Sequence, residues 1–200
     1  MHGNIISQLR AHCEVIGAVE RELTPRIAET VALLAETFRS GNKLLVMGNG
    51  GSAADAQHLA AEIVGRFKME RRGLPAIALT TDSSILTALG NDYGFDAIFT
   101  RQIQALAAPG DLVMGITTSG NSRNVAAALE LALSQGCRTV ALLGGDGGII
   151  AGLVELHLIV PSRDTPRIQE GHITIIHILC DLLEQELFGD GANLPEGCRG

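Results

Sequence analysis

Apolar residues recur every three or four positions through the first forty residues, which is the spacing of an amphipathic helix. The dipeptide Thr24-Pro25 predicts a break, because proline lacks the N–H that continues a helix. We therefore predict two helices within residues 4–40, the second beginning at Pro25 and ending at Ser40-Gly41. The apolar stripe of the first helix is expected to pack against a partner subunit or against the flank of the domain. This stripe consists of Ile5, Leu9, Cys13, Ile16, Val19 and Leu23.

Beyond residue 42, short and continuous apolar runs alternate with helical segments. The runs cover 43–48, 76–80, 111–117, 138–143 and 156–160, and the helices cover 52–67, 83–90, 95–107, 122–135, 148–153 and 167–188. This alternation is typical of a parallel sheet that helices cover on both faces. The predicted fold class is α/β, a doubly wound five-stranded parallel sheet flanked by helices, with an N-terminal helical extension. We assign residues 1–40 to oligomerisation, 41–189 to the sheet domain and 190–200 to a flexible tail.

The composition is that of one domain with its own core, and it argues against several classes of protein. Of 200 residues, 46% are hydrophobic and 18% are charged, which is enough for a core without disulfide or metal staples. A net charge of −7 and an aromatic content of 3% argue against nucleic-acid binding. Because we find neither a membrane-spanning apolar run nor a signal peptide, we expect a cytoplasmic protein without membrane contact. Cys13, Cys137 and Cys180 are expected in or near the core, and Cys198 in the tail.

A glycine-rich segment, GNGGSA at 48–53, separates the first predicted strand from the next helix. In an open parallel sheet, ligands bind at the carboxyl ends of the strands. Glycines there let the backbone approach an anion, and the helix dipole attracts negative charge. Ser52 is expected to cap the helix. The sequence of this segment also fits the G-x-G-x-x-A pattern of dinucleotide-binding proteins. Alternatively, a tight turn with a helix cap would explain the glycines without any ligand.

A second loop of this kind, TTSGNS at 117–122, lies between the third predicted strand and its following helix. Its hydroxyls and backbone amides, without any Lys or Arg, suit a phosphate monoester held by hydrogen bonds at a helix N-terminus. Two such loops in one sheet favour a sugar-phosphate cradle over two unrelated turns.

Two of the predicted helices carry candidate acid–base groups. On the helix after the first loop, His58 and Glu62 are neighbours at i,i+4 spacing, on a stripe that also contains Asp55 and Arg66. An ordinary solvated face with an ion pair would explain this stripe equally well. The closing helix is apolar nearly all round, so its histidines could also be hydrogen-bonded core residues. Its conspicuous polar members are Gln169, His172 and His177.

Four segments together resemble the bacterial phosphoheptose isomerases, a family of the sugar-isomerase (SIS) superfamily. They are GNGGSAADAQHLAAEIVGRF (48–67), LTTDSSILTALGNDYGFDAIFTRQI (79–103), TTSGNSRNV (117–125) and RIQEGHITIIHILCDLLE (167–184). The resemblance implies an aldose–ketose isomerase that converts sedoheptulose 7-phosphate to D-glycero-D-manno-heptose 7-phosphate. The product would supply heptose precursors of lipopolysaccharide or other surface glycans. The resemblance also implies a homotetramer with active sites at subunit interfaces.

The same resemblance implies roles for residues of this chain. Glu62 and His177 match the catalytic acid/base pair. One zinc ion per subunit would bind to His58, Glu62, Gln169 and His177. The substrate-binding residues would be Asn49, Gly50, Gly51, Ser52, Glu62, Asn91, Asp92, Thr117, Thr118, Ser119, Ser122 and Gln169. Because eight residues of helix span roughly 12 Å, Gln169 and His177 reach one ion only if it lies between them or if a neighbouring subunit supplies one of them.

The chemistry of a ketose–aldose conversion suits these residue types. One proton moves between C1 and C2 through a cis-enediol, which a carboxylate such as Glu62 can transfer. A second proton moves between the two oxygens, which suits an imidazole such as His177. A divalent metal would polarise the carbonyl and stabilise the enediolate.

Two rival functions stand beside the isomerase. A member of the same superfamily is a non-catalytic scaffold that binds the replication initiator protein. It departs from the isomerases at the positions matching Glu62 and His177, both of which are present here. A dinucleotide-dependent enzyme would need a ribose-binding acid after the second strand, where Asp82 is only nearby.

Overall fold

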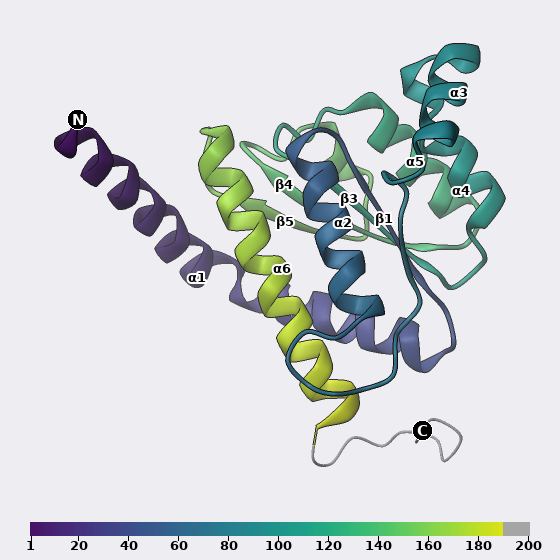
Figure 1. The fold of residues 1–200 in the computed structure, drawn as a ribbon, viewed down its shortest axis with the longest axis horizontal. Coiled ribbons are helices and arrows are strands. Elements are labelled where there is room, and N and C mark those ends of the chain that lie inside the picture. Colours follow the sequence, from purple (N-terminus) through teal and green to yellow (C-terminus); the bar gives the residue numbers. More distant parts are fainter. Residues whose placement is uncertain (190–200) are drawn as a thin grey trace.

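The computed structural model describes residues 1–189 and contains one five-stranded sheet with helices on both faces (Figure 1). The strands are β1 (Leu44–Gly48), β2 (Ala76–Ala78), β3 (Leu112–Thr117), β4 (Arg138–Gly144) and β5 (Leu156–Val160). The α-helices are α1 (His2–Arg39), α2 (Gly51–Val64), α3 (Ser83–Tyr93), α4 (Thr100–Leu106), α5 (Arg123–Ser134) and α6 (Thr165–Phe188). Two short 3₁₀ turns, η1 (Phe95–Ala97) and η2 (Ile149–Gly152), complete the elements. The predicted tail, 190–200, and Cys198 lie outside the described residues.

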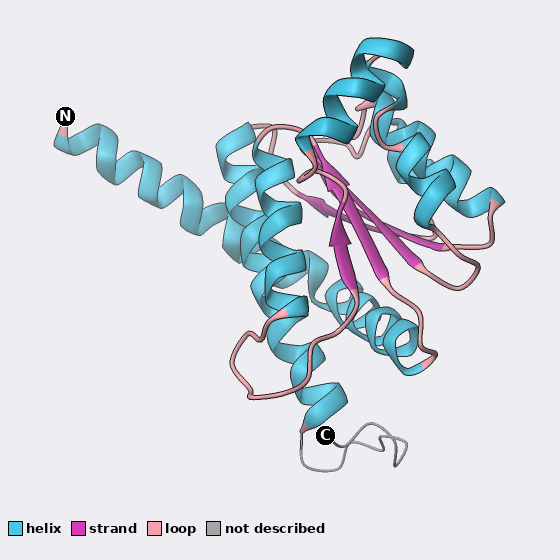
Figure 2. Cartoon of the chain, turned by 45° about the vertical axis from the view of Figure 1, so that its right-hand side comes forward, coloured by secondary structure: helices cyan, strands magenta, loops and turns pink. Residues whose placement is uncertain are grey.

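The sheet has the strand order β2-β1-β3-β4-β5, and every neighbouring pair is parallel. Helices α1, α2 and α6 pack on one face, and α3, α4 and α5 pack on the other (Figures 1 and 2). Strands β1, β3 and β4 are buried almost throughout, which explains why their sequences are continuous apolar runs. The predicted doubly wound α/β fold is therefore confirmed.

The strand order reverses between β1 and β3, because the chain moves outward in one direction from β1 to β2 and in the other from β3 to β5. These two strands pair from Leu44 with Leu112 to Gly48 with Ile116. In doubly wound sheets, ligands bind outside the carboxyl ends of the strands at this switch point. The two candidate loops, 48–53 and 117–122, follow β1 and β3 and so lie on either side of it.

Helix α1 is one continuous helix, so the predicted break at Thr24-Pro25 is wrong. A proline inside a helix costs a backbone hydrogen bond. Here the residues on both sides of Pro25 are held by burial, since Leu23 and Ile27 belong to the core that α1 shares with α6 and the sheet. Tertiary packing therefore overrides the local signal, and the second half of the N-terminal extension is part of the core of the sheet domain.

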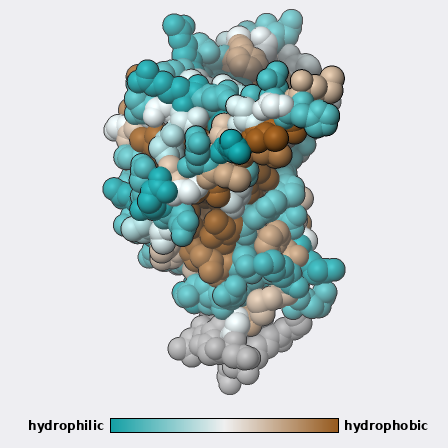
Figure 3. Space-filling model, turned by 90° about the vertical axis from the view of Figure 1, so that its left-hand side faces the viewer, coloured by the Kyte–Doolittle hydropathy of each residue, from teal (hydrophilic) through white to brown (hydrophobic). Residues whose placement is uncertain are grey.

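The first half of α1 projects away from the body (Figures 1 and 2). The predicted apolar stripe is exposed at its start, where Ile5 is 52% and Leu9 is 62% accessible, and buried at its end, at Val19 and Leu23. Cys13, expected near the core, is exposed as well, whereas Cys137 and Cys180 are buried as predicted. Figure 3 shows apolar surface in the middle of the face from which α1 projects. Within residues 1–189, no helix combines the length and the apolar character needed to cross a membrane.

Candidate active site

The first candidate loop closes tightly between β1 and α2. Gly50 is the N-cap of α2 and has φ +55, in the left-handed region that favours glycine. A Cβ atom at Gly48 would lie within 2.8 Å of Ser52, so only glycine allows this approach. Ser52 is buried in the first turn and does not cap the helix, so that prediction is wrong. The loop instead uses backbone geometry alone, which leaves the positive end of the α2 dipole close to the surface.

A pair of asparagines joins the first loop to α5. Each side-chain amide of Asn49 and Asn124 donates to the other, at 2.9 Å in both directions. Asn124 is buried, and it also accepts the backbone N–H of Val125. Asn49 was predicted as a substrate ligand, whereas Asn124 was not singled out. Its place in the motif TTSGNSRNV was the available signal.

The second loop gathers three hydroxyls at the start of α5. Thr117 Oγ1 lies 2.9 Å from Ser122 Oγ and 3.4 Å from Ser119 Oγ. Ser122 is the N-cap of α5, and its side chain makes no capping hydrogen bond, so its hydroxyl is engaged with Thr117 and not with the helix backbone. Thr118, predicted with them, is half-buried beside them. Hydroxyls at a helix N-terminus are suited to a phosphate group.

Helices α2 and α6 run side by side and bring the predicted acid–base residues together (Figure 1). Nε2 of His58 lies 2.9 Å from Nε2 of His177 and 3.6 Å from Oε1 of Glu62. The side chains remain accessible, at 40% for His58 and 24% for Glu62, and His177 is exposed. The three groups therefore face a surface that a ligand can reach, although 119 residues separate the two histidines.

An aromatic ring fixes the other side of His177. Phe67, in the segment after α2, stacks on the imidazole with a centroid distance of 5.6 Å and an interplanar angle of 25°. His58 meets the same imidazole edge-on, with a centroid distance of 5.1 Å. The sequence predicted a helix to residue 67, whereas α2 ends at Val64, so the contact of Phe67 with His177 was missed.

Asp55 is a further acidic group of this region that sequence reasoning did not assign. It lies one helical turn before His58, and its Oδ2 is buried without a hydrogen-bond partner. Burial raises the pKa of Asp55 to about 6, against the opposing attraction of His58. The i+3 spacing between Asp55 and His58 was the signal that could have identified it.

Three predicted ligands lie apart from the histidines in the single chain. The amide of Gln169 packs against Gly51, where a Cβ atom would overlap it, so Gln169 lies beside the start of α2, two turns before His58. Asn91 and Asp92 are exposed on α3, where Asn91 Nδ2 donates to Asp92 Oδ1 at 2.8 Å. The structure therefore assembles the acid–base residues but not the full predicted ligand set.

His172 is a buried core residue, which is the alternative interpretation given above for histidines of this helix. It is fully buried, and its Nε2 lies 2.9 Å from the carbonyl oxygen of Leu143. Burial lowers the pKa of His172 to about 4, against the opposing effect of that hydrogen bond. It is neutral at pH 7 and takes no part in the surface site.

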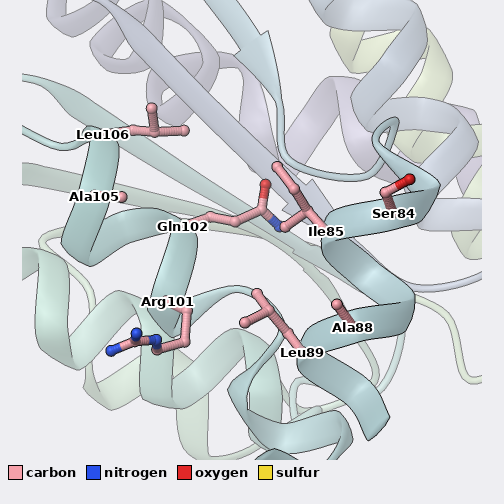
Figure 4. Close-up of a pocket in the computed structure, with 8 residues that line it drawn as sticks. All are labelled: Ser84, Ile85, Ala88, Leu89, Arg101, Gln102, Ala105 and Leu106. Carbon is pink, nitrogen blue, oxygen red and sulfur yellow. The ribbon is translucent and has the colours of Figure 1, made fainter. Parts of the chain in front are cut away.

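Two cavities flank the helices on the other face of the sheet. One, of about 370 Å³, lies between the first loop and α3 and is lined by Asn49, Gly50, Leu86 and Phe99 among others. The second, of about 530 Å³, lies between α3 and α4 and is mostly apolar, with Ile85, Leu89 and Leu106 in its wall (Figure 4). Neither contains Glu62 or His177.

The donor atoms around His58 suit a zinc ion in type and spacing. Zinc takes imidazole nitrogen and carboxylate oxygen at about 2.0–2.2 Å, so tetrahedral ligand atoms lie roughly 3.4 Å apart. The separations of 2.9 and 3.6 Å at His58 lie on either side of that value. Across residues 1–189, however, no group of three or more His, Cys, Asp or Glu side chains is already arranged as a metal site.

Comparisons with known proteins agree with one another. The sequence model of the SIS domain matches residues 9–144. A phosphoheptose isomerase of Geobacter sp. strain M21 is 71% identical over 94% of this chain and 97% of its own length, and that of Geobacter sulfurreducens is 70% identical over 94% and 100%. The structure of a phosphoheptose isomerase from Neisseria gonorrhoeae superposes with a TM-score of 0.88 at 41% identity, covering 92% of this chain and 98% of the other. One from Francisella tularensis gives 0.89 at 39% identity, covering 92% and 97%.

Proposed function

The chain belongs to the phosphoheptose isomerases of the SIS domain family, and we propose that Glu62 and His177 carry out its proton transfers. These enzymes are aldose–ketose isomerases that convert sedoheptulose 7-phosphate to D-glycero-D-manno-heptose 7-phosphate. The observation that supports this assignment best is the meeting of Glu62, His58 and His177 on one accessible surface. The reaction makes heptose phosphate, from which lipopolysaccharide or other surface glycans are built.

The proton on carbon is assigned to Glu62. Its carboxylate removes a proton from C1 of the ketose, which leaves a cis-enediolate, and returns a proton to C2 to give the aldose. The phosphate is held by the hydroxyls of Thr117, Ser119 and Ser122 and by the N-termini of α2 and α5, which fixes the sugar without a cationic side chain.

The proton on oxygen is assigned to His177. The imidazole passes a proton from the C1 hydroxyl to the C2 oxygen while the enediol exists. In this structure one Nε2 of the pair His58–His177 donates to the other at 2.9 Å. Phe67 covers the face of the His177 ring and keeps it oriented.

We propose one zinc ion per subunit, held by His58, Glu62 and His177 together with Gln169. When bound, zinc would polarise the carbonyl and stabilise the enediolate. Since Gln169 packs against Gly51 in the single chain, either the side chain moves or a neighbouring subunit supplies it. Metal analysis of the purified protein, paired with activity after chelation, tests this. One equivalent of zinc, with activity lost on chelation and restored by zinc, is expected; full activity of metal-free protein would contradict it.

We further propose a cytoplasmic homotetramer with active sites at subunit interfaces. The exposed stripe of α1 and the separation of Asn91, Asp92 and Gln169 from the histidines both support sites that neighbouring subunits complete. Within residues 1–189, Cys13, Cys137 and Cys180 form no disulfide, which suits a reducing compartment.

The substitution Glu62→Gln tests the catalytic assignment. The amide keeps the shape of the carboxylate and loses its basicity, so turnover should fall by at least about 100-fold while sugar-phosphate binding is retained. The assay is aldose formation from sedoheptulose 7-phosphate, with binding measured by calorimetry. Glu70→Gln is the matched control, because Glu70 is 90% exposed in the segment after α2. Undiminished turnover in Glu62→Gln would refute the role of the base.

The scaffold that binds a replication initiator is not favoured. Relatives at about 70% identity over nearly the full length are phosphoheptose isomerases, and both acid–base residues are present at the site. A protein without turnover that binds the initiator tightly would reverse this choice.

A further inference from the structure

We propose that the buried ion pair Arg71–Glu184 is a positioning device for the acid–base residues, an inference that rests on the proposed function. Arg71 lies outside the motifs that suggested the site, and Glu184 ends the fourth of them without having been singled out. Both are almost fully buried, with side-chain exposure of 2% and 1%, and Arg71 Nε lies 2.9 Å from Glu184 Oε1. The pair lies between the end of α2, which carries Glu62, and the helix α6, which carries His177.

Glu184 organises the segment that follows α2. Its carboxylate accepts the backbone N–H groups of three consecutive residues, Phe67, Lys68 and Met69, each at 2.8 Å. These bonds lower the pKa of Glu184 despite the opposing effect of burial, so the carboxylate is charged. An irregular segment is thereby fixed to α6 through its backbone, at the position where Phe67 meets His177.

Arg71 closes the end of α2. Its guanidinium donates to the carbonyl oxygens of Glu62 and Ile63 at 2.9 Å and of Gly65 at 3.1 Å. The last carbonyls of a helix have no partner within the helix, so a buried cation there satisfies them and complements the dipole. The turn of α2 that presents Glu62 is therefore tied to Glu184 through one side chain.

The consequence for the site is carried by Phe67. Its backbone is held by Glu184, and its ring stacks on His177, seven residues earlier on α6. Lys68 reinforces the arrangement, because its Nζ lies 5.4 Å from the Phe67 ring centroid and 2.7 Å from Asp181. The buried pair Arg71–Glu184 thus fixes the backbone at Glu62, the proposed base. It also fixes the backbone at Phe67, whose ring orients His177.

A buried ion pair is not in itself evidence of a functional role, since well-packed apolar residues often stabilise a fold as well. The distinguishing expectation is that loosening this pair moves His177 and lowers the rate of the chemical step. A purely structural anchor would lower only the temperature of unfolding.

The test compares Glu184→Gln and Phe67→Leu with Phe67→Tyr, which keeps the ring, and with Glu70→Gln, a Glu→Gln change at an exposed position of the same segment. We expect kcat to fall by about 10- to 100-fold in the first two variants, as for lost supporting contacts at other sites. KM should stay within about twofold, because the phosphate loops are untouched, and the two controls should behave as wild type.

The second readout does not depend on isomerase activity. The proton NMR signal of His177 Hε1, assigned by its loss in His177→Gln, carries a ring-current shift from the stacked Phe67. It should move in Glu184→Gln and Phe67→Leu and stay in place in the controls. If Glu184→Gln does not fold, Phe67→Leu decides alone. A wild-type kcat and an unmoved Hε1 signal in the variants would overturn the positioning role, whereas inactive wild-type protein would instead refute the proposed function.

Discussion

Two histidines five residues apart on α6 have opposite environments, and the difference follows from the face of the helix each occupies. His172 points into the core beneath β4 and bonds the carbonyl of Leu143, whereas His177 meets His58 and Phe67 at the surface. Five residues rotate a helix by roughly 140°, which is enough to exchange core for solvent. Side-chain type alone therefore does not separate a structural histidine from a chemical one, and the helix face does.

The buried histidine predicts a pH dependence of stability. The pKa of His172 is lowered from 6.5 to about 4 in the folded protein, so between these values the unfolded chain takes up a proton that the folded chain does not. The free energy of unfolding should therefore fall as the pH drops from 6.5 to 4, by up to about 3 kcal/mol from this residue. His172→Gln keeps a donor to Leu143 and does not titrate. Chemical denaturation of both proteins across this range should give curves that diverge below pH 6.5; parallel curves would contradict the assignment.

At the scale of elements, the loops after β1 and β3 depend on close approaches of backbone. Gly120, in the second loop, has φ +66, and a Cβ atom there would overlap the carbonyl of Gly147. Gly41, after α1, has φ +78 but no atom within 4 Å of such a Cβ. The two glycines share a backbone conformation and differ in the space around them.

The substitutions Gly120→Ala and Gly41→Ala use this difference. Both introduce the strain of a left-handed alanine, about 1 kcal/mol or more. Only Gly120→Ala adds a collision between backbones, so it should destabilise the protein by at least about 2 kcal/mol more, as measured by denaturation. Since Ser119 and Ser122 flank this glycine, KM for the sugar phosphate should rise as well, whereas Gly41→Ala should leave KM unchanged. Equal losses of stability in the two variants would show that the backbone at Gly147 moves aside at little cost, and would contradict this prediction.

The elements most accurately predicted from the sequence are those whose burial is uniform. Strands β1, β3 and β4 are buried almost throughout, and their predicted and observed ranges differ by at most one residue at either end, against two at the partly exposed β2. The proline in α1 misled the prediction, because Leu23 and Ile27 pack against distant residues that no local pattern displays. Glu62 and His177 were found because motifs mark them. Arg71 was not, since a segment without periodicity gives no sign of the helix it will contact, and Glu184, at the end of the fourth motif, was not singled out because its partners lie in that segment.

At the scale of the whole molecule, the start of α1 extends beyond its contacts with α6, where Arg167 donates to the carbonyl of Gln8 and His12 meets Glu170. It projects from the body with Ile5 and Leu9 exposed, an arrangement that leaves apolar surface in water unless another subunit covers it (Figure 3). Asn91, Asp92 and Gln169, which are predicted to bind the substrate, likewise lie apart from the histidines. Assembly would account for both features together, because a neighbouring subunit would bury the stripe and complete the site.

A charge placed on the stripe separates assembly from a merely exposed helix. Leu9→Asp puts a carboxylate where we expect a subunit contact, whereas Ser7→Asp puts the same charge about 160° around the helix. Light scattering after gel filtration should give about 84 kDa for wild type and Ser7→Asp, four times the 21.0 kDa chain, and a smaller mass for Leu9→Asp. Because burial of a charge without a partner is costly, the shift should be largest at low protein concentration. Activity should fall with the mass if neighbouring subunits complete the site. A dissociated but fully active Leu9→Asp protein would therefore place every catalytic and binding residue within one chain. A monomeric wild-type protein would show that the stripe of α1 does not hold subunits together.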